Sequence, residues 1–187
     1  MMDLKNLEMR VAQLEARTAL SELVTQYGIA CDEHDISGLK YLFTKDAEIT
    51  STNGLLRAKG RDEITEMFCK VLATRGPGYH WTHDHIIRFD RGSEHKASGL
   101  LLSHAETTPN GVQSLAGLKY DDEYRFEEGT WRFAKRSLSF LYYVPASEYK
   151  TVLTQENRVV AGDKRLLADY PENLTTWQNF DSTYVGK

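Results

Sequence analysis

The sequence predicts one α+β domain in which a curved sheet wraps around a long N-terminal helix. Two observations lead to this expectation. Up to about residue 75, apolar residues recur at the three- and four-residue steps of helices, whereas beyond Gly78 the pattern becomes extended. Helices that precede a run of strands are typical of an α+β domain with an antiparallel meander. A chain of 187 residues is long enough for one such domain with a sizeable core.

The N-terminal region predicts one long helix, or two abutting helices, from about Asp3 to about His34. Its apolar stripe at helical spacing consists of Leu4, Leu7, Val11, Leu14, Leu20, Leu23, Tyr27 and Ala30. We expect the first half of this helix to extend beyond the domain and pack on a partner subunit. Asp35 suits the N-cap of a short second helix from Ser37 to Phe43.

A hairpin and a third helix are expected next. Ala47 to Thr52 alternates like a strand, Asn53-Gly54 is a strong hairpin turn, and Leu55 to Lys59 forms the return strand. Gly60 to Glu63 then opens a helix. Its predicted buried face consists of Ile64, Met67, Phe68, Val71 and Leu72.

The second half of the chain predicts four strands, near residues 80–90, 96–108, 112–127 and 130–144. Turn residues separate them at Arg91-Gly92-Ser93, Pro109-Asn110-Gly111 and Glu127-Glu128-Gly129. We therefore expect a domain over residues 1–145. Residues 146–187 are expected to form a C-terminal extension that packs on the domain or on a neighbouring subunit. Short helices are predicted within it at Glu148 to Gln155 and at Asp163 to Asp169.

The composition excludes several classes of protein. Net charge is -4, the pI is about 5.9, and no Lys/Arg cluster has the density of a nucleic-acid footprint. No stretch approaches the roughly twenty apolar residues of a membrane span, and the N-terminus lacks the apolar core of a signal peptide. Cys31 and Cys69 lack metal-type spacing and suit a reducing compartment. We expect a cytoplasmic protein that binds neither nucleic acid nor membranes.

His80 and Asp32 are the strongest candidates for catalysis. His80 follows the turn Pro77-Gly78 at the start of a strand-like run. Asp32 lies near the C-terminus of the long helix, where the helix dipole opposes a carboxylate, and such a locally unfavourable residue is a pointer to function. A neutral imidazole oriented by a carboxylate is a general base near neutral pH. If the two side chains meet in one pocket, the protein is expected to move protons.

Five further residues are candidates for substrate binding. Tyr27 is expected either to hydrogen-bond a substrate oxygen or to lie in the core. Arg136, on the last strand, would steady an anionic intermediate or pair with the helix-end aspartate. His104 shares a strand face with Leu100 and Leu102, so we expect it either to point into the cavity or to be a core histidine. Tyr120 and Trp81 are expected to line the same cavity.

The three histidines His80, His83 and His85 also suggest a metal site. On a regular strand, however, His83 and His85 share one face while His80 takes the other, so the three cannot converge without a bulge. No nucleotide-binding glycine loop is visible in the sequence. We therefore expect neither a metal nor another cofactor.

Several segments, in this order, resemble the SnoaL-like branch of the NTF2-like superfamily, which has a cone-shaped α+β fold. They are Leu20-Ser21-Glu22-Leu23-Val24-Thr25-Gln26-Tyr27 continuing to Asp32, Gly38 to Ala47, His80 with Asp84 four positions on, Leu118 to Tyr124, and Gly129 to Arg136. The resemblance covers about residues 15–145. At the histidine motif the chain departs from the family, which more often has asparagine where this chain has Asp84.

Within that branch the chain resembles most the group of scytalone dehydratase, bile-acid 7α-dehydratase and hexachlorocyclohexane dehydrochlorinase. The resemblance implies a His80–Asp32 pair that takes a proton while a neighbouring group leaves, with Tyr27 and Arg136 in supporting roles. We therefore expect a cofactor-independent lyase acting on a small hydrophobic, cyclic substrate. Two alternatives stay open: a ketosteroid-isomerase-like double-bond isomerase, and a non-catalytic binding or assembly module such as the small subunit of a ring-hydroxylating dioxygenase. A homodimer or homotrimer is expected from the exposed sheet face and the N-terminal leucine stripe.

Overall fold

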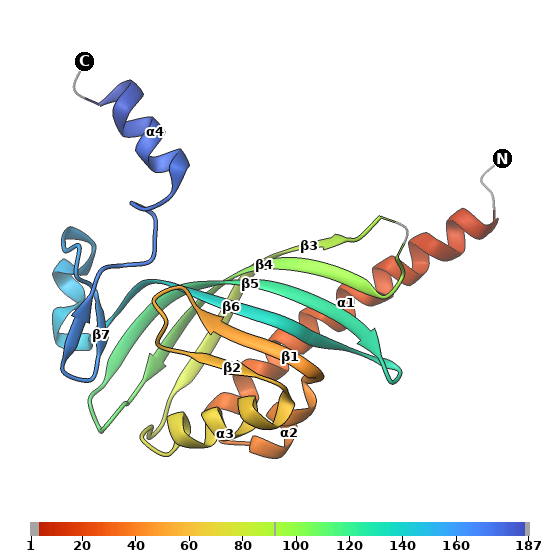
Figure 1. Ribbon diagram of the computed structural model, residues 1–187, viewed down its shortest axis with the longest axis horizontal. Coiled ribbons are helices and arrows are strands. Elements are labelled where there is room, and N and C mark those ends of the chain that lie inside the picture. The colour runs from red at the N-terminus through yellow and green to blue at the C-terminus, as the bar shows by residue number, and fades with distance from the viewer. Residues whose placement is uncertain (1–3, 92, 186–187) are drawn as a thin grey trace.

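A curved sheet packed against a long helix forms the body of the protein (Figure 1). The computed structural model describes residues 4–91 and 93–185. Helices of the body are α1 (Leu4–Asp32), α2 (Ile36–Tyr41) and α3 (Arg61–Leu72). Its strands are β1 (Phe43–Ser51), β2 (Arg57–Lys59), β3 (Tyr79–Phe89), β4 (Lys96–Thr107), β5 (Ser114–Glu127) and β6 (Thr130–Pro145). The predicted α+β architecture is confirmed. Asp3, where the first helix was predicted to begin, and Gly92, in a predicted turn, lie outside the described residues.

The strands are ordered β2-β1-β6-β5-β4-β3 across the sheet. From β3 to β6 neighbouring strands are antiparallel, as expected of a meander, whereas β1 runs parallel to β6. The turns between the meander strands contain residues of positive φ at Asn110-Gly111 and Glu128-Gly129. Glycine and asparagine tolerate this conformation, which is why the sequence revealed these turns.

Helix α1 is a single helix that is buried only in its C-terminal half. Leu20, Leu23 and Val24 are buried against the sheet, while the apolar residues Leu4 and Leu14 are 68% and 65% exposed. Figure 1 shows this N-terminal half projecting beyond the sheet. Packing of the exposed half on a partner subunit stays a prediction.

The junction of α2 and β1 differs in part from the sequence prediction. The Asp35 side chain accepts a hydrogen bond from the Gly38 backbone N–H at 2.8 Å, which confirms the predicted N-cap. Helix α2 nevertheless ends at Tyr41, and β1 already begins at Phe43 rather than at Ala47. The reason is tertiary, because Phe43 pairs with Phe133 of the distant strand β6.

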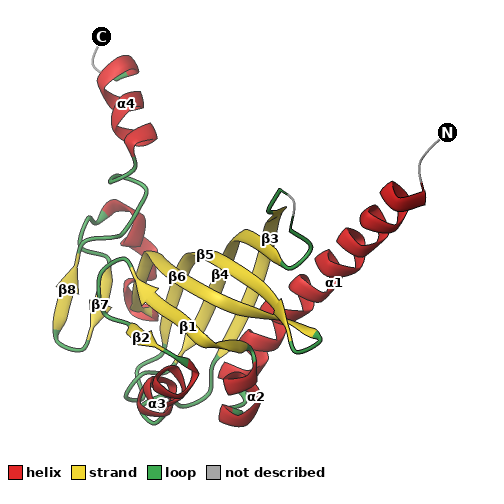
Figure 2. Ribbon diagram, turned by 45° about the vertical axis from the view of Figure 1, so that its right-hand side comes forward, coloured by secondary structure: helices red, strands yellow, loops and turns green. Residues whose placement is uncertain are grey.

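The C-terminal extension contains a 3₁₀ helix η1 (Ala146–Thr154), strands β7 (Val159–Ala161) and β8 (Lys164–Leu166), and helix α4 (Thr175–Tyr184). The prediction of a helix at Asp163 to Asp169 is wrong, because β7 and β8 form a hairpin there (Figure 2). Two β-branched residues in β7 and a positive φ at Gly162 favour this hairpin. Helix α4, which the sequence analysis missed, has no buried residue and projects away from the body (Figure 1).

Buried polar contacts fasten the extension to β6. The Asp169 carboxylate accepts hydrogen bonds from the Phe140 backbone N–H at 2.7 Å and from the Asn53 side chain at 3.4 Å. Arg158, only 3% exposed, donates to the Leu141 carbonyl at 2.7 Å and to Glu172. Within the described chain, no helix is long and apolar enough to cross a membrane.

Candidate active site

A narrow cavity of about 50 Å³ lies between α1, α3 and the inner face of the sheet. Its polar lining comes from Tyr27, Cys31, Arg75, His80, Thr107, Tyr120 and Tyr143. Its apolar lining comes from Leu56, Phe68, Val71, Ala105, Ala116, Leu118, Leu138 and Phe140. Walls of this kind, mostly apolar with a few converging polar groups, are typical of a site for a small molecule.

The structure brings His80 and Asp32 together at this cavity. The imidazole Nδ1 lies 2.5 Å from Asp32 Oδ1, and the His80 backbone N–H donates to Asp32 Oδ2 at 2.8 Å. Both side chains are largely buried, with 11% and 14% of their surfaces exposed. An ionised carboxylate can only accept, so Nδ1 carries the proton and Nε2 keeps its lone pair. Among the described residues Nε2 has no hydrogen-bond partner, so it is available as a base.

Gly28 allows the helix and the strand to approach each other at this point. It lies one helical turn before Asp32 in α1, and a Cβ atom built on it would be 3.3 Å from the Cβ of His80. Such a separation is tighter than most real Cβ contacts, so a larger residue here would push α1 away from β3. Gly28 was not among the site residues predicted from the sequence. Its position four residues before an aspartate on the same helix face is the signal that was available.

Two tyrosines of the predicted site also line the cavity. Tyr27 is buried, and its ring makes edge contacts with Phe68 at 6.0 Å and with Tyr120 at 6.1 Å between centroids. Burial raises the pKa of Tyr27 well above its usual value and raises the pKa of Tyr120 to about 12. Both phenols are therefore protonated at neutral pH and can donate hydrogen bonds.

Arg136 occupies a different place from the one predicted. Its guanidinium is fully buried and bonds to both oxygens of Asp122, with Nε–Oδ1 and Nη2–Oδ2 distances of 2.9 and 2.8 Å. It also lies over the rings of Tyr27 and Tyr120, 4.2 and 4.0 Å from their centroids. The prediction that it pairs with Asp32 is therefore wrong, because Asp122 of the adjacent strand already holds it. The arginine supports the cavity wall from behind and does not line the cavity.

His85 extends this buried network. Its Nε2 lies 2.9 Å from the Tyr124 hydroxyl, which donates to Asp122 Oδ2 at 2.9 Å. Since the hydroxyl proton is used on the carboxylate, His85 must donate from Nε2. Its buried Nδ1 has no partner in the described residues, and a proton there would be a buried donor without an acceptor, which favours the neutral ring. Burial lowers the pKa of His85 below its usual value, which agrees with the neutral form.

A bulge in β3 between Thr82 and His85 changes the expected facing of the histidines. His85 lies on the inner face with His80, whereas His83 is on the outer face, so the expectation that His83 and His85 share a face is wrong. In the described part of the chain, no three His, Cys, Asp or Glu side chains are grouped so as to hold a metal ion.

His104 and Trp81 lie outside the cavity. His104 alternates along β4 with the cavity residues Ala105 and Thr107, so it faces outward. There its ring is hydrogen-bonded to His83 at 3.0 Å and to the Tyr142 hydroxyl at 2.9 Å. Trp81 is 42% exposed on the same outer face. His104 is therefore neither a cavity residue nor a core histidine, the two places expected for it, and the expectation that Trp81 lines the cavity is wrong. On each strand it is the neighbouring residues that face inward.

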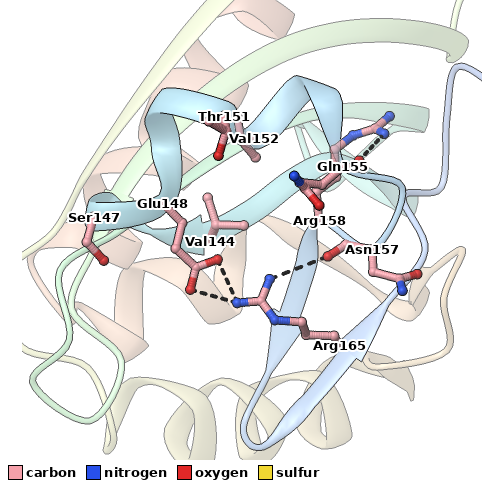
Figure 3. A pocket seen from close by; sticks show the side chains of 9 residues that line it. All are labelled: Val144, Ser147, Glu148, Thr151, Val152, Gln155, Asn157, Arg158 and Arg165. Carbon is pink, nitrogen blue, oxygen red and sulfur yellow. Dashed lines mark hydrogen bonds and ion pairs between the residues drawn. The ribbon is translucent and has the colours of Figure 1, made fainter.

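A larger hollow of about 520 Å³ lies in the C-terminal extension, between η1 and the β7–β8 hairpin (Figure 3). Its two arginines are already neutralised by the chain itself. Arg165 bonds to Glu148 at 2.6 Å, and Arg158 is bound to Glu172 and to backbone carbonyls. Figure 3 shows the Arg165–Glu148 pair lying across the hollow. With these charges paired internally, the smaller cavity at His80 is the better candidate for chemistry.

The fold and the site together define an α+β cone with a histidine–aspartate pair at a narrow cavity lined in part by aromatic rings. Residues 12–137 match the SnoaL-like domain family, which is well over half of the chain. The protein belongs to this family, within the NTF2-like superfamily. Among curated proteins, the sequence comparison returns no match.

Solved structures with the same fold include enzymes. A type 2 hexachlorocyclohexane dehydrochlorinase (LinA) superimposes with a TM-score of 0.67 at 22% identity, covering 73% of this chain and 92% of its own. A candidate scytalone dehydratase from Novosphingobium aromaticivorans has a TM-score of 0.65 at 21% identity, covering 73% and 91%. LinA type 3 from Novosphingobium barchaimii has a TM-score of 0.65 at 21% identity, covering 74% and 94%. At these identities the likeness establishes the fold alone.

Proposed function

We propose that the protein is a cofactor-independent lyase in which His80 removes a proton from a carbon atom of a small hydrophobic, cyclic substrate. The observation that carries the proposal is the short hydrogen bond between His80 Nδ1 and Asp32 Oδ1 beside a mostly apolar cavity. Asp32 fixes the imidazole so that Nε2 is the basic nitrogen. The same carboxylate stabilises the imidazolium that forms when Nε2 takes the proton.

The elimination conserves atoms and electrons within the substrate and the His80 side chain. His80 Nε2 takes the proton from one carbon, the C–H electron pair forms a double bond to the neighbouring carbon, and a hydroxide or halide leaves that neighbour. The imidazolium then returns its proton to a departing hydroxide, or to solvent when a halide leaves. No electrons are exchanged with another molecule, so the step needs no redox partner. The protonated phenols of Tyr27 and Tyr120 are proposed to donate hydrogen bonds to a substrate oxygen or to the leaving group.

Entry of a ring-sized substrate requires the cavity to widen. Its volume of about 50 Å³ accommodates one or two water-sized groups, whereas sites for small organic ligands span roughly 300–1,000 Å³. The segment Gly76–Gly78 follows the cavity residue Arg75 and contains two glycines, so it is the segment that we propose to move.

The comparisons support a lyase without identifying its substrate. The matched structures include proteins named as a dehydrochlorinase and as a candidate dehydratase, and both names describe eliminations. We propose the same class of reaction here because the fold is shared and the His80–Asp32 pair has the chemistry that elimination needs.

The test is a screen of hydroxylated and chlorinated cyclic compounds with the purified protein and no added cofactor, analysed by mass spectrometry. A product lighter by one water or one hydrogen chloride is expected, and it should be lost in His80→Ala and Asp32→Asn. His83→Ala, which removes an exposed histidine from the opposite face of the same strand, is the matched control and should remain active.

Three other outcomes would change the proposal. A product of unchanged mass that takes up deuterium from heavy water would make the protein a double-bond isomerase that uses the same base. Turnover that survives His80→Ala would remove the histidine from the mechanism. Absence of turnover together with a tightly co-purifying large subunit would favour a non-catalytic assembly module.

We also propose that the chain consists of a domain over residues 1–145 and an extension over residues 146–187, because the last long strand ends at Pro145. Self-association into a dimer or trimer is proposed from the exposed apolar residues Leu4, Val11 and Leu14 of α1 and Trp81 of the outer sheet face. Analytical ultracentrifugation of the purified protein would test it, and a monomer at micromolar concentration would contradict it.

A further inference from the structure

Arg75 lies at the border of the cavity, in the loop between α3 and β3. Its backbone N–H donates to the Leu72 carbonyl at 3.0 Å, and its backbone forms an isolated bridge with Pro109. The main chain of this residue is therefore fixed at the end of α3, while its half-buried side chain lines the same cavity as His80.

The guanidinium of Arg75 differs from the buried arginines by its lack of a counter-charge. Arg136 is bound to Asp122 and Arg158 to Glu172. In the described part of the chain, Arg75 has no side-chain hydrogen bond, ion pair or ring contact. A partly desolvated cation without a partner costs free energy that an incoming anion would offset.

The surroundings of Arg75 favour an anion as that partner. No Asp or Glu lines the cavity, and both oxygens of the Asp32 carboxylate are bonded to His80. Burial raises the pKa of the Cys31 thiol to about 12, and the positive charge of Arg75 opposes this rise. The charge of Arg75 therefore acts across the cavity as well as at its border.

We propose that Arg75 binds an anionic group of the substrate, and that the substrate is a carboxylic acid with a hydrophobic ring. A guanidinium presents a planar fork of N–H donors that matches a carboxylate in bidentate geometry. A phosphate dianion would leave further oxygens unpaired against the apolar walls, and its second charge would have no partner there. The carboxylate would bind Arg75 at a distance from the carbon that loses its proton. This remote contact would position the ring over His80.

This inference rests on the proposed function only in assuming that the substrate enters this cavity, so it is tested by binding rather than by turnover. Benzoate, phenylacetate and cyclohexanecarboxylate are titrated into the protein by isothermal calorimetry, each beside its uncharged amide. The three acids are expected to bind more tightly than their amides. In Arg75→Gln, acid binding should weaken by about tenfold or more, because a hydrogen bond to a charged group is lost, while amide binding stays unchanged.

Matched variants separate this inference from the proposed chemistry. Arg88→Gln removes the same charge from an exposed arginine on β3 and should leave acid binding unchanged. His80→Ala should abolish turnover yet retain acid binding. Arg75→Lys should retain part of the affinity, since it keeps the charge but loses the fork. Neither Arg75 variant should have a lower thermal midpoint than the natural protein, because the fold makes no bond to this guanidinium and its unpaired charge does not stabilise the fold.

Three results would overturn the inference. One is that none of the acids binds at millimolar concentration. Another is that the amides bind as tightly as the acids, and the third is that Arg75→Gln binds the acids as well as the natural protein does. Failure of the lyase proposal would be seen separately, as lack of turnover in a protein that still binds acids through Arg75.

Discussion

Asp122→Asn is expected to destabilise the protein strongly, because it leaves a buried guanidinium without its counter-charge. Arg136 and Asp122 have fully buried side chains and are joined by two hydrogen bonds of 2.8 and 2.9 Å. The asparagine has nearly the shape of the aspartate but carries no charge, and it presents an NH₂ group where one oxygen accepted a bond. Breaking one side of a buried ion pair costs about 3–5 kcal/mol. That is a large share of the roughly 5–15 kcal/mol that stabilises a typical domain.

Urea unfolding followed by circular dichroism and by tryptophan fluorescence would measure this loss. A chain of this size loses about 2–4 °C in thermal midpoint for each kcal/mol. The thermal midpoint is therefore expected to fall by about 6–20 °C. The slope of the free energy with urea should not change, because the surface exposed on unfolding stays the same.

The control is Asp121→Asn, which removes the same charge from the exposed neighbour on the other face of β5. It should change stability by less than about 0.5 kcal/mol. In the double variant Asp122→Asn/Arg136→Met neither charge remains, so it should be less destabilised than Asp122→Asn alone. If Asp122→Asn costs no more than Asp121→Asn, the buried pair is not what holds this part of the cone together.

Two further predictions concern β3. In Gly28→Ala the new Cβ would meet His80 at 3.3 Å, so α1 should shift by a few tenths of an ångström and the Asp32–His80 hydrogen bond should lengthen. The downfield Nδ1 proton signal should move upfield and turnover should fall by about tenfold; an unchanged signal would contradict this. Burial lowers the pKa of His85, so the unfolded chain binds a proton at a pH where the folded chain does not. Stability should therefore fall as the pH drops below about 6.5, by at most about 1.4 kcal/mol per pH unit. Urea midpoints across this range should show a flatter dependence in His85→Phe, and an equal slope would exclude His85 as the cause.

The sequence predicted the elements of the body well where local physics decides them. The change from helical to alternating spacing after Gly78 located the meander strands within two residues. Turn residues such as Asn110 and Gly111 were informative because their positive φ is a local requirement. The β7–β8 hairpin was missed because its short strands carry no alternation long enough to be distinguished from a helix.

The candidate site was only partly predictable. His80 and Asp32 were identified from a turn and a helix end, and the structure places them in contact. Arg136 was correctly expected to be a cation near the site, but its predicted carboxylate partner was wrong. Its actual partner, Asp122, is identified only by the register of β5 and β6. His104 was misplaced because alternation defines two faces of a strand without saying which one lies inside.

The sequence by itself therefore determined the period of each long element, most turns, and the two side chains whose chemistry suits proton transfer. These depend on residues close together in the chain. The tertiary structure alone decided which strand face is inside, where β3 bulges, and how closely α1 approaches His80 at Gly28. It also decided that Arg136 is paired while Arg75 is not. Those features depend on contacts between residues dozens of positions apart, which packing settles and local spacing does not encode.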